Sequence, residues 1–140
     1  MTPLGYNKLI EHEGCVYHAY QDSLGYWTIG YGHCIDERKG CGLSEKVTRI
    51  MLDDDIAKWT AYARQQFDWF DALDEVRQDV LVMLCFNMGN NIKTFKLMLN
   101  ALKWRNWHEA AFQLANSEWG RQVGTARKRE LSNALETGRW

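Results

Sequence analysis

The distribution of glycine and proline constrains the fold of this chain more than any other sequence feature. Six of the eleven glycines fall between Gly14 and Gly42, and the single proline is Pro3. The glycine-rich stretch also carries β-branched and aromatic residues, a mixture typical of short strands joined by tight turns. Beyond it, apolar residues recur at helical spacing. The sequence therefore predicts a mostly helical α+β fold with a small β lobe near the N-terminus.

Capping residues set the expected helix boundaries. Thr2 and Pro3 favour a helix start, and this helix should end at Glu13 because Gly14 follows. Ser44 can cap a helix that reaches about residue 66, and Asp74 can cap one that runs to residue 88. The apolar run 80–86 within the latter would also suit a buried strand, but the cap and the terminal glycine favour helix. Further helices are expected at residues 92–103, 107–116 and 125–136.

Composition excludes several classes of protein. A chain of 140 residues is about one domain, and no apolar stretch approaches the ~20 residues of a membrane span. The net charge of −1 disfavours a nucleic-acid binder built on a basic field. The first 20 residues carry Lys8, Glu11 and Glu13, unlike a secretory signal peptide. The four cysteines form no Cys-x-x-Cys pair, so we expect free thiols, as in a reducing compartment, and no zinc site.

Two carboxylates in different surroundings suggest acid–base chemistry. Glu13 falls in the last turn of the first helix, where the negative end of the helix dipole should raise its pKa and suit a general acid. Asp22 begins the turn Asp22–Gly25, where backbone hydrogen bonds can keep it ionised, and Thr28 could help it hold a water. Glu11 lies on a different face of the helix from Glu13. Acids at helix ends and in turns are also common without any catalytic role.

The same segment carries a long family signature. Glu13-Gly14, then Asp22, then Gly25-Tyr26-Trp27-Thr28-Ile29-Gly30-Tyr31-Gly32-His33 match without a gap the catalytic signature of the phage-type lysozymes, glycoside hydrolase family 24. Later segments resemble further landmarks of that family, namely residues 73–77, 86–89, 107–111, 117–119, 137–138 and Trp140. The chain is thus similar to this family over most of its length.

The resemblance implies a lysozyme-like fold with two lobes joined by a long helix. The β lobe would cover residues 14–43, the connecting helix 44–66, and the helical lobe 1–13 together with 66–140. It also implies hydrolysis of the β-1,4 bond between N-acetylmuramic acid and N-acetylglucosamine of bacterial peptidoglycan, with inversion. Glu13 would be the general acid, Asp22 would activate water or stabilise charge, and Thr28 would position the water.

The resemblance extends to binding residues and partners. Phe86 and Asn87 fall where the family lines its sugar cleft, and Gln113 aligns with a substrate-contacting amide. Arg127 occupies the place of an arginine that pairs with the catalytic glutamate. Arg129 is the other candidate for that place. We expect a monomeric endolysin that needs no metal or cofactor. It would be made in the host cytoplasm, require a holin, and lyse the host by acting on the wall in the periplasm.

Some alternatives remain open from sequence. A lytic transglycosylase would use one glutamate without Asp22 and Thr28, and a wall-binding module would need none of the three residues. A bacterial antagonism effector with the same chemistry cannot be distinguished from an endolysin. For His33, a structural ion pair that ties strands to a helix is favoured over a catalytic base. Four tryptophans are expected to pack in the core, namely Trp59, Trp104, Trp107 and Trp119.

Overall fold

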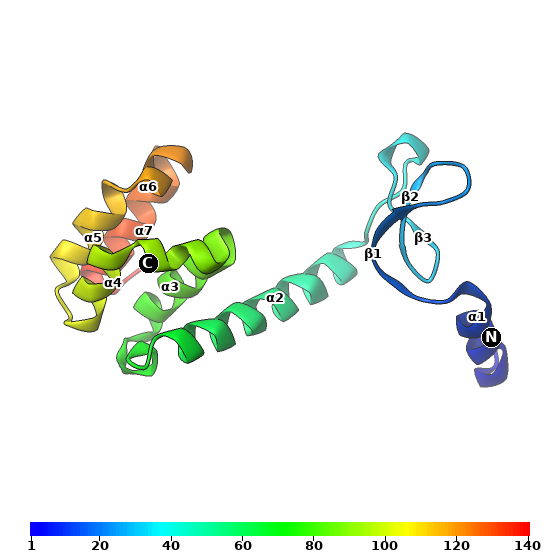
Figure 1. The fold of residues 1–140 in the computed structure, drawn as a ribbon, viewed down its shortest axis with the longest axis horizontal. Helices are drawn as coiled ribbons and strands as arrows, with labels where there is room; N and C mark the ends of the chain where they lie inside the picture. The colour runs from blue at the N-terminus through cyan, green and yellow to red at the C-terminus, as the bar shows by residue number, and fades with distance from the viewer. The chain divides into compact units, whose positions relative to one another are not determined.

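The computed structural model describes all of residues 1–140 and has an α+β fold (Figure 1). The chain divides into two compact units, the N-terminal unit Met1–Ile50 and the C-terminal unit Met51–Trp140. The division falls inside the long helix α2, Glu45–Gln66. None of the helices combines the length and the apolar character that a membrane span requires. The expected association of residues 1–13 with the helical lobe stays a prediction.

The N-terminal unit begins with the helix that its capping residues predict. Helix α1 spans Pro3–Glu13, and Thr2 Oγ1 accepts a hydrogen bond from the Gly5 amide at 3.2 Å. The helix ends because Gly14 takes a positive φ of 64°, a conformation that L-residues with a side chain rarely adopt. Glu13 is therefore the last helical residue, immediately before the chain turns into the sheet.

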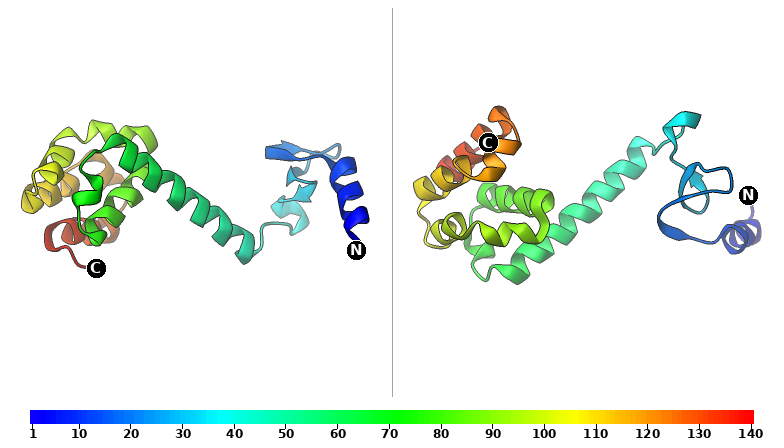
Figure 2. Two further views of the ribbon diagram at one scale, coloured as in Figure 1. Left: turned by 90° about the horizontal axis from the view of Figure 1, so that it is seen from below. Right: turned by 45° about the horizontal axis from the view of Figure 1, so that its top comes forward.

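The sheet of the N-terminal unit is a small antiparallel meander (Figure 2). Strands β1 (Val16–Gln21), β2 (Trp27–Gly30) and β3 (His33–Cys34) lie in the order β1-β2-β3. In this register Thr28 lies opposite Tyr20 on one side and Cys34 on the other. A 3-10 turn, η1 (Glu37–Lys39), follows and leads to α2. The strands and turns expected from the glycine-rich stretch are confirmed.

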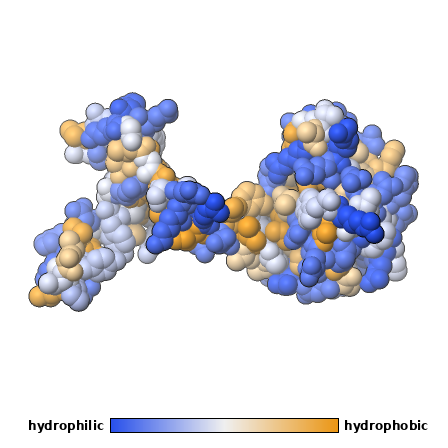
Figure 3. Space-filling view, turned by 180° about the vertical axis from the view of Figure 1, so that it is seen from behind, coloured by the Kyte–Doolittle hydropathy of each residue, from blue (hydrophilic) through white to orange (hydrophobic).

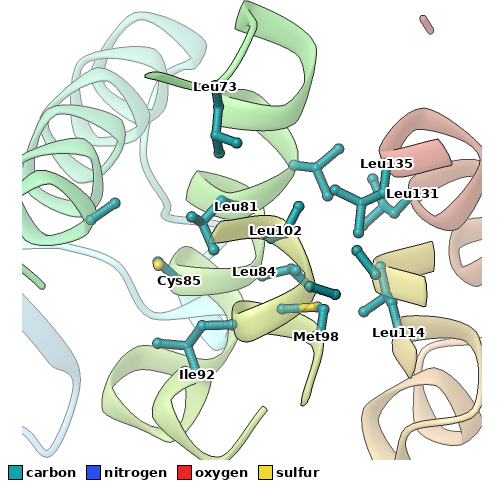
Figure 4. Packing of buried hydrophobic residues seen from close by; sticks show 14 of the residues in the cluster. Leu73, Leu81, Leu84, Cys85, Ile92, Met98, Leu102, Leu114, Leu131 and Leu135 are labelled. Atoms are coloured by element: carbon teal, nitrogen blue, oxygen red, sulfur yellow. The ribbon is translucent and has the colours of Figure 1, made fainter. Parts of the chain in front are cut away.

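The C-terminal unit is helical and holds the apolar core. Its elements after α2 are η2 (Phe70–Ala72), α3 (Glu75–Met88), η3 (Gly89–Thr94), α4 (Lys96–Lys103), α5 (Trp107–Ala115), α6 (Glu118–Gln122) and α7 (Thr125–Thr137). Leucines from α3, α4, α5 and α7 meet in its centre (Figure 4). Hydrophilic residues cover much of the outer surface, with apolar patches between them (Figure 3). Burial of this core is the main stabilising term of the unit.

Two helix predictions need correction. The helix expected at 92–103 begins only at Lys96, because residues 89–94 form a 3-10 helix and Phe95 has a non-helical ψ of 47°. The Thr94 hydroxyl donates to the Asn91 carbonyl at 2.7 Å, which satisfies an acceptor outside any α-helical ladder. Helix α6 was not expected, because five residues are too few to show a helical period.

A buried arginine ties the start of α3 to the end of α7. Arg77 Nε and Nη2 donate to the carbonyls of Leu135 and Glu136 at 2.7 and 2.8 Å, and Nη1 bonds Asp74 at 2.6 Å. Its guanidinium also lies 3.9 Å from the centre of the Trp107 ring. The carbonyls at a helix C-terminus lack partners within the helix, so Arg77 acts as the cap of α7. Burial by itself raises the pKa of Asp74, but the hydrogen bonds from Arg77 outweigh it, so the pKa of Asp74 is lowered.

Candidate active site

Asp22 is held by the backbone of its own turn. Its Oδ1 accepts hydrogen bonds from the amides of Leu24 and Tyr26 at 2.9 and 2.8 Å. The turn is closed by backbone bonds from Gly25 N to Asp22 O and from Asp22 N to Tyr26 O, both 2.9 Å. Oδ2 takes no hydrogen bond from the protein. The carboxylate is thus fixed through one oxygen and free to bind a proton or a water through the other.

Thr28 lies next to this turn on β2 and is only 4% exposed. Its Oγ1 donates to the Tyr26 carbonyl at 3.2 Å, and the Tyr26 amide in turn donates to Asp22. Because the hydroxyl proton is used in this way, the oxygen is left as an acceptor. A water beside Thr28 would therefore point a proton at the threonine oxygen.

Glu13 reaches the turn between β2 and β3. Its Oε2 lies 3.1 Å from the position that a Cβ on Gly32 would occupy, and Gly32 has a φ of +73°. Only glycine gives both this backbone conformation and the room for the carboxylate. The neighbouring acid Glu11 instead pairs with Lys8 at 2.6 Å, although both acids are exposed. The structure thus separates the two acids by their surroundings.

A buried carboxylate that sequence analysis missed, Asp36, holds the backbone next to the candidate residues. Asp36 accepts hydrogen bonds from the Trp27 amide at 2.9 Å and from the Arg38 side chain at 2.7 and 2.9 Å. Arg38 also donates to the Gly25 carbonyl at 2.7 Å. Bonds from the Arg38 side chain and from the Trp27 amide hold the pKa of Asp36 well below its usual range. The spacing Asp-x-Arg directly after a predicted strand was the sequence signal that could have indicated this ion pair.

His33 has a structural role, as expected, but through a different partner. Its Nε2 lies 2.8 Å from the Gly42 carbonyl, so it connects β3 with the chain beyond η1. The predicted ion pair to a helix is not formed, and the partner of the imidazole is a backbone carbonyl instead.

The remaining predicted site residues lie in the C-terminal unit. Phe86 and Arg127 line the same cavity of about 720 Å³, which is mainly apolar and includes Trp140. Asn87 Oδ1 accepts from the Trp119 indole at 2.7 Å. Gln113 donates to Glu109 at 2.7 Å and lines a separate cavity of about 320 Å³ near α4.

The structure therefore groups Phe86 with Arg127 and places Gln113 in a different cavity. The competing arginine, Arg129, lines a third cavity, of about 450 Å³, between α5 and α7. Pairing of Arg127 with Glu13 stays a prediction, as do the roles of the other residues. No group of three or more His, Cys, Asp or Glu side chains is arranged to hold a metal ion.

In the N-terminal unit a small meander fixes one carboxylate in a turn, and a glutamate ends the helix before it. A helical unit follows along the chain. These features are those of a lysozyme-type α+β protein. Comparison with known proteins agrees. The Phage lysozyme family profile matches residues 10–134. The chain therefore belongs to the phage lysozyme family, whose members are glycoside hydrolases.

Two relatives illustrate the range of similar proteins. Probable T4-type lysozyme 1 of Dictyostelium discoideum is 29% identical over an alignment 153 residues long. The alignment covers 90% of this chain and 89% of the relative. An endolysin of Acyrthosiphon pisum secondary endosymbiont phage 1 is 32% identical over 91 residues, covering 65% of this chain and 61% of the relative.

Proposed function

We propose that this protein hydrolyses the β-1,4 bond between N-acetylmuramic acid and N-acetylglucosamine in bacterial peptidoglycan. The observation that carries the proposal is the arrangement in the N-terminal unit. Asp22 is anchored through Oδ1 with Oδ2 free, Thr28 bonds the same residue, Tyr26, that holds Asp22, and Glu13 rests against Gly32 without an ion-pair partner. This arrangement supports a role for Glu13 and Asp22 as the carboxylate pair that cleaves a glycosidic bond.

In the proposed reaction Glu13 donates a proton to the glycosidic oxygen as the bond from that oxygen to the anomeric carbon breaks. A water attacks the anomeric carbon from the opposite face of the sugar. Asp22 Oδ2 takes one proton of that water and Thr28 Oγ1 accepts a hydrogen bond from the other. This sequence inverts the anomeric configuration, which requires a gap of roughly 6.5–9.5 Å between the two carboxyl groups when the glycan is bound.

The C-terminal unit would contribute to binding of the glycan and its peptides. The half-exposed ring of Phe86 offers an apolar face to a sugar, and the amides of Asn87 and Gln113 offer donors for acetamido or peptide carbonyl groups. Arg127 would bring a positive charge to the cavity that Phe86 also lines. This arrangement assigns substrate contacts to both units of the chain.

The biological setting is part of the same proposal. Similarity to an endolysin supports a role in host cell lysis. The protein would act as a monomer, accumulate in the host cytoplasm and reach the wall after a holin opens the membrane. A lytic transglycosylase and a non-catalytic wall-binding module are the alternatives that an experiment must separate.

The test is the chemistry of the product ends. Purified peptidoglycan is incubated with the protein, and the released fragments are analysed by mass spectrometry and for new reducing ends. New reducing N-acetylmuramic acid ends support the proposal. Ends of the 1,6-anhydro type would replace it with a transglycosylase, and wall binding without products would replace it with a binding module. Proton NMR at the start of the reaction distinguishes inversion, which gives the α-anomer first, from retention.

A further inference from the structure

Two of the four cysteines lie at the ends of a loop that the fold already closes. Cys34 is the last residue of β3, and Cys41 follows η1 and Gly40, whose φ is +66°. The Cys41 amide donates to the Asp36 carbonyl at 3.2 Å. The hydrogen bond of His33 Nε2 to Gly42 O, at 2.8 Å, joins the residues immediately outside the two cysteines. The His33 side chain thus holds the two ends of the segment 34–41 near each other, and a backbone bond closes the turn within it.

The Cys41 thiol, whose Sγ lies 3.9 Å from the Lys39 carbonyl, is close enough to Cys34 within this closed segment for the two thiols to influence each other. A side-chain hydrogen bond with Cys34, helped by burial, raises the pKa of the Cys41 thiol. Both side chains are only half-buried, so a small oxidant can reach them. The other cysteines have different surroundings, because Cys85 is wholly buried in the C-terminal core and Cys15 interacts with Tyr31.

We propose that Cys34 and Cys41 form a disulfide when the protein meets a thiol–disulfide oxidant, such as an oxidised dithiol protein of the cell envelope. One thiolate attacks the oxidant disulfide and releases the first oxidant thiol. The second thiolate then attacks the mixed disulfide, forms the Cys34–Cys41 bond and releases the second oxidant thiol. The two cysteines are oxidised, the oxidant is reduced to two thiols, and no other reactant is needed.

This bond would stabilise the part of the molecule that carries Asp22 and Thr28. The segment 34–41 contains Asp36 and Arg38, which hold the amide of Trp27 and the carbonyl of Gly25. Covalent closure reduces the freedom of the segment in the unfolded chain and so favours the arrangement that supports the hairpin. The protein would be made as a dithiol in a reducing compartment and become more stable outside it. The inference does not depend on the proposed hydrolysis.

The experiment uses the full chain and oxidised glutathione. The protein is incubated with the oxidant, free thiols are alkylated in denaturant, and peptide mass mapping identifies which cysteines escaped alkylation. We expect a loss of two hydrogen atoms with a Cys34–Cys41 link, alkylation of Cys15 and Cys85 only, and a rise of about 4–8 °C in the unfolding temperature that dithiothreitol reverses.

Three serine variants control the result. Cys34→Ser and Cys41→Ser should abolish both the link and the temperature rise, and the two report on the same bond if one of them folds poorly. Cys15→Ser should retain both. Four alkylated cysteines after oxidation, a link that involves Cys15, or a glutathione adduct without the internal bond would overturn the proposal. A Cys34–Cys41 link without a temperature rise would overturn its stabilising role.

Discussion

The contact between Glu13 and Gly32 permits a test in which two glycines of the same loop serve as variant and control. Gly30 and Gly32 have nearly the same positive φ, +67° and +73°, so alanine at either position costs about 1–2 kcal/mol of backbone strain. A Cβ at position 30 meets nothing within 4 Å, whereas one at position 32 lies 3.1 Å from Glu13 Oε2. The difference between the two variants therefore reports on the glutamate alone.

The size of that difference follows from the geometry. At 3.1 Å the Glu13 carboxylate must move by a few tenths of an ångström. This motion costs little stability, because the carboxylate is the free end of a flexible side chain. A misplacement of 1 Å can reduce the rate about 100-fold, so a few tenths should reduce it roughly 4- to 10-fold.

Lysis of purified cell walls, followed by turbidity, gives the rates, and urea unfolding gives the stabilities. We expect Gly30→Ala and Gly32→Ala to lose similar stability, while Gly32→Ala alone loses activity beyond that loss. Equal activities in two equally stable variants would refute the idea that Gly32 makes room for a working Glu13 carboxylate.

Two further predictions concern buried ionic groups. Arg77→Ala should destabilise the C-terminal unit by about 3–5 kcal/mol, because two helix-end carbonyls and a carboxylate lose their partner. The control variant Arg64→Ala removes an exposed ion pair and should cost less than about 1 kcal/mol. Denaturant unfolding measures both changes in stability. A small effect for Arg77→Ala would contradict its capping role. Asp36 has a folded-state pKa below the 3.8 of the free group, so its stabilising contribution is complete above that pH and is lost as the pH falls through the folded-state value. Asp36→Asn should therefore be less stable than the parent near neutral pH, with a difference that shrinks in acid melts below about pH 4; a pH-independent difference would exclude the carboxylate as its cause.

Local signals in the sequence predicted local structure well. Thr2, Asp74 and Asn106 each cap the helix that was expected to follow them, because a cap depends on residues two or three positions away. The turn at Asp22 formed for the same reason, with its amides bonded to the side chain that opens it. Such contacts can be inferred without knowing the tertiary fold.

Contacts between distant residues could not be inferred in this way. Asp36 interacts with an amide nine positions earlier, and Arg77 caps a helix 58 residues later, so neither role leaves a periodic trace in the sequence. Trp104 was expected in the core but is 74% exposed, because it follows the last turn of α4 rather than lying on its apolar face. Trp119, at 5% exposed, is buried as expected and bonds Asn87.

The most direct test of the account compares the two acids of α1. Glu13→Gln keeps the shape of the side chain but removes the acid, and Glu11→Gln makes the same change two positions earlier at an exposed ion pair. We predict that Glu13→Gln lowers the rate of wall lysis by at least about 100-fold, with an unfolding temperature near that of the parent, and that Glu11→Gln lyses walls at the parental rate. Parental lysis by Glu13→Gln would contradict the central claim that this carboxyl protonates the leaving sugar.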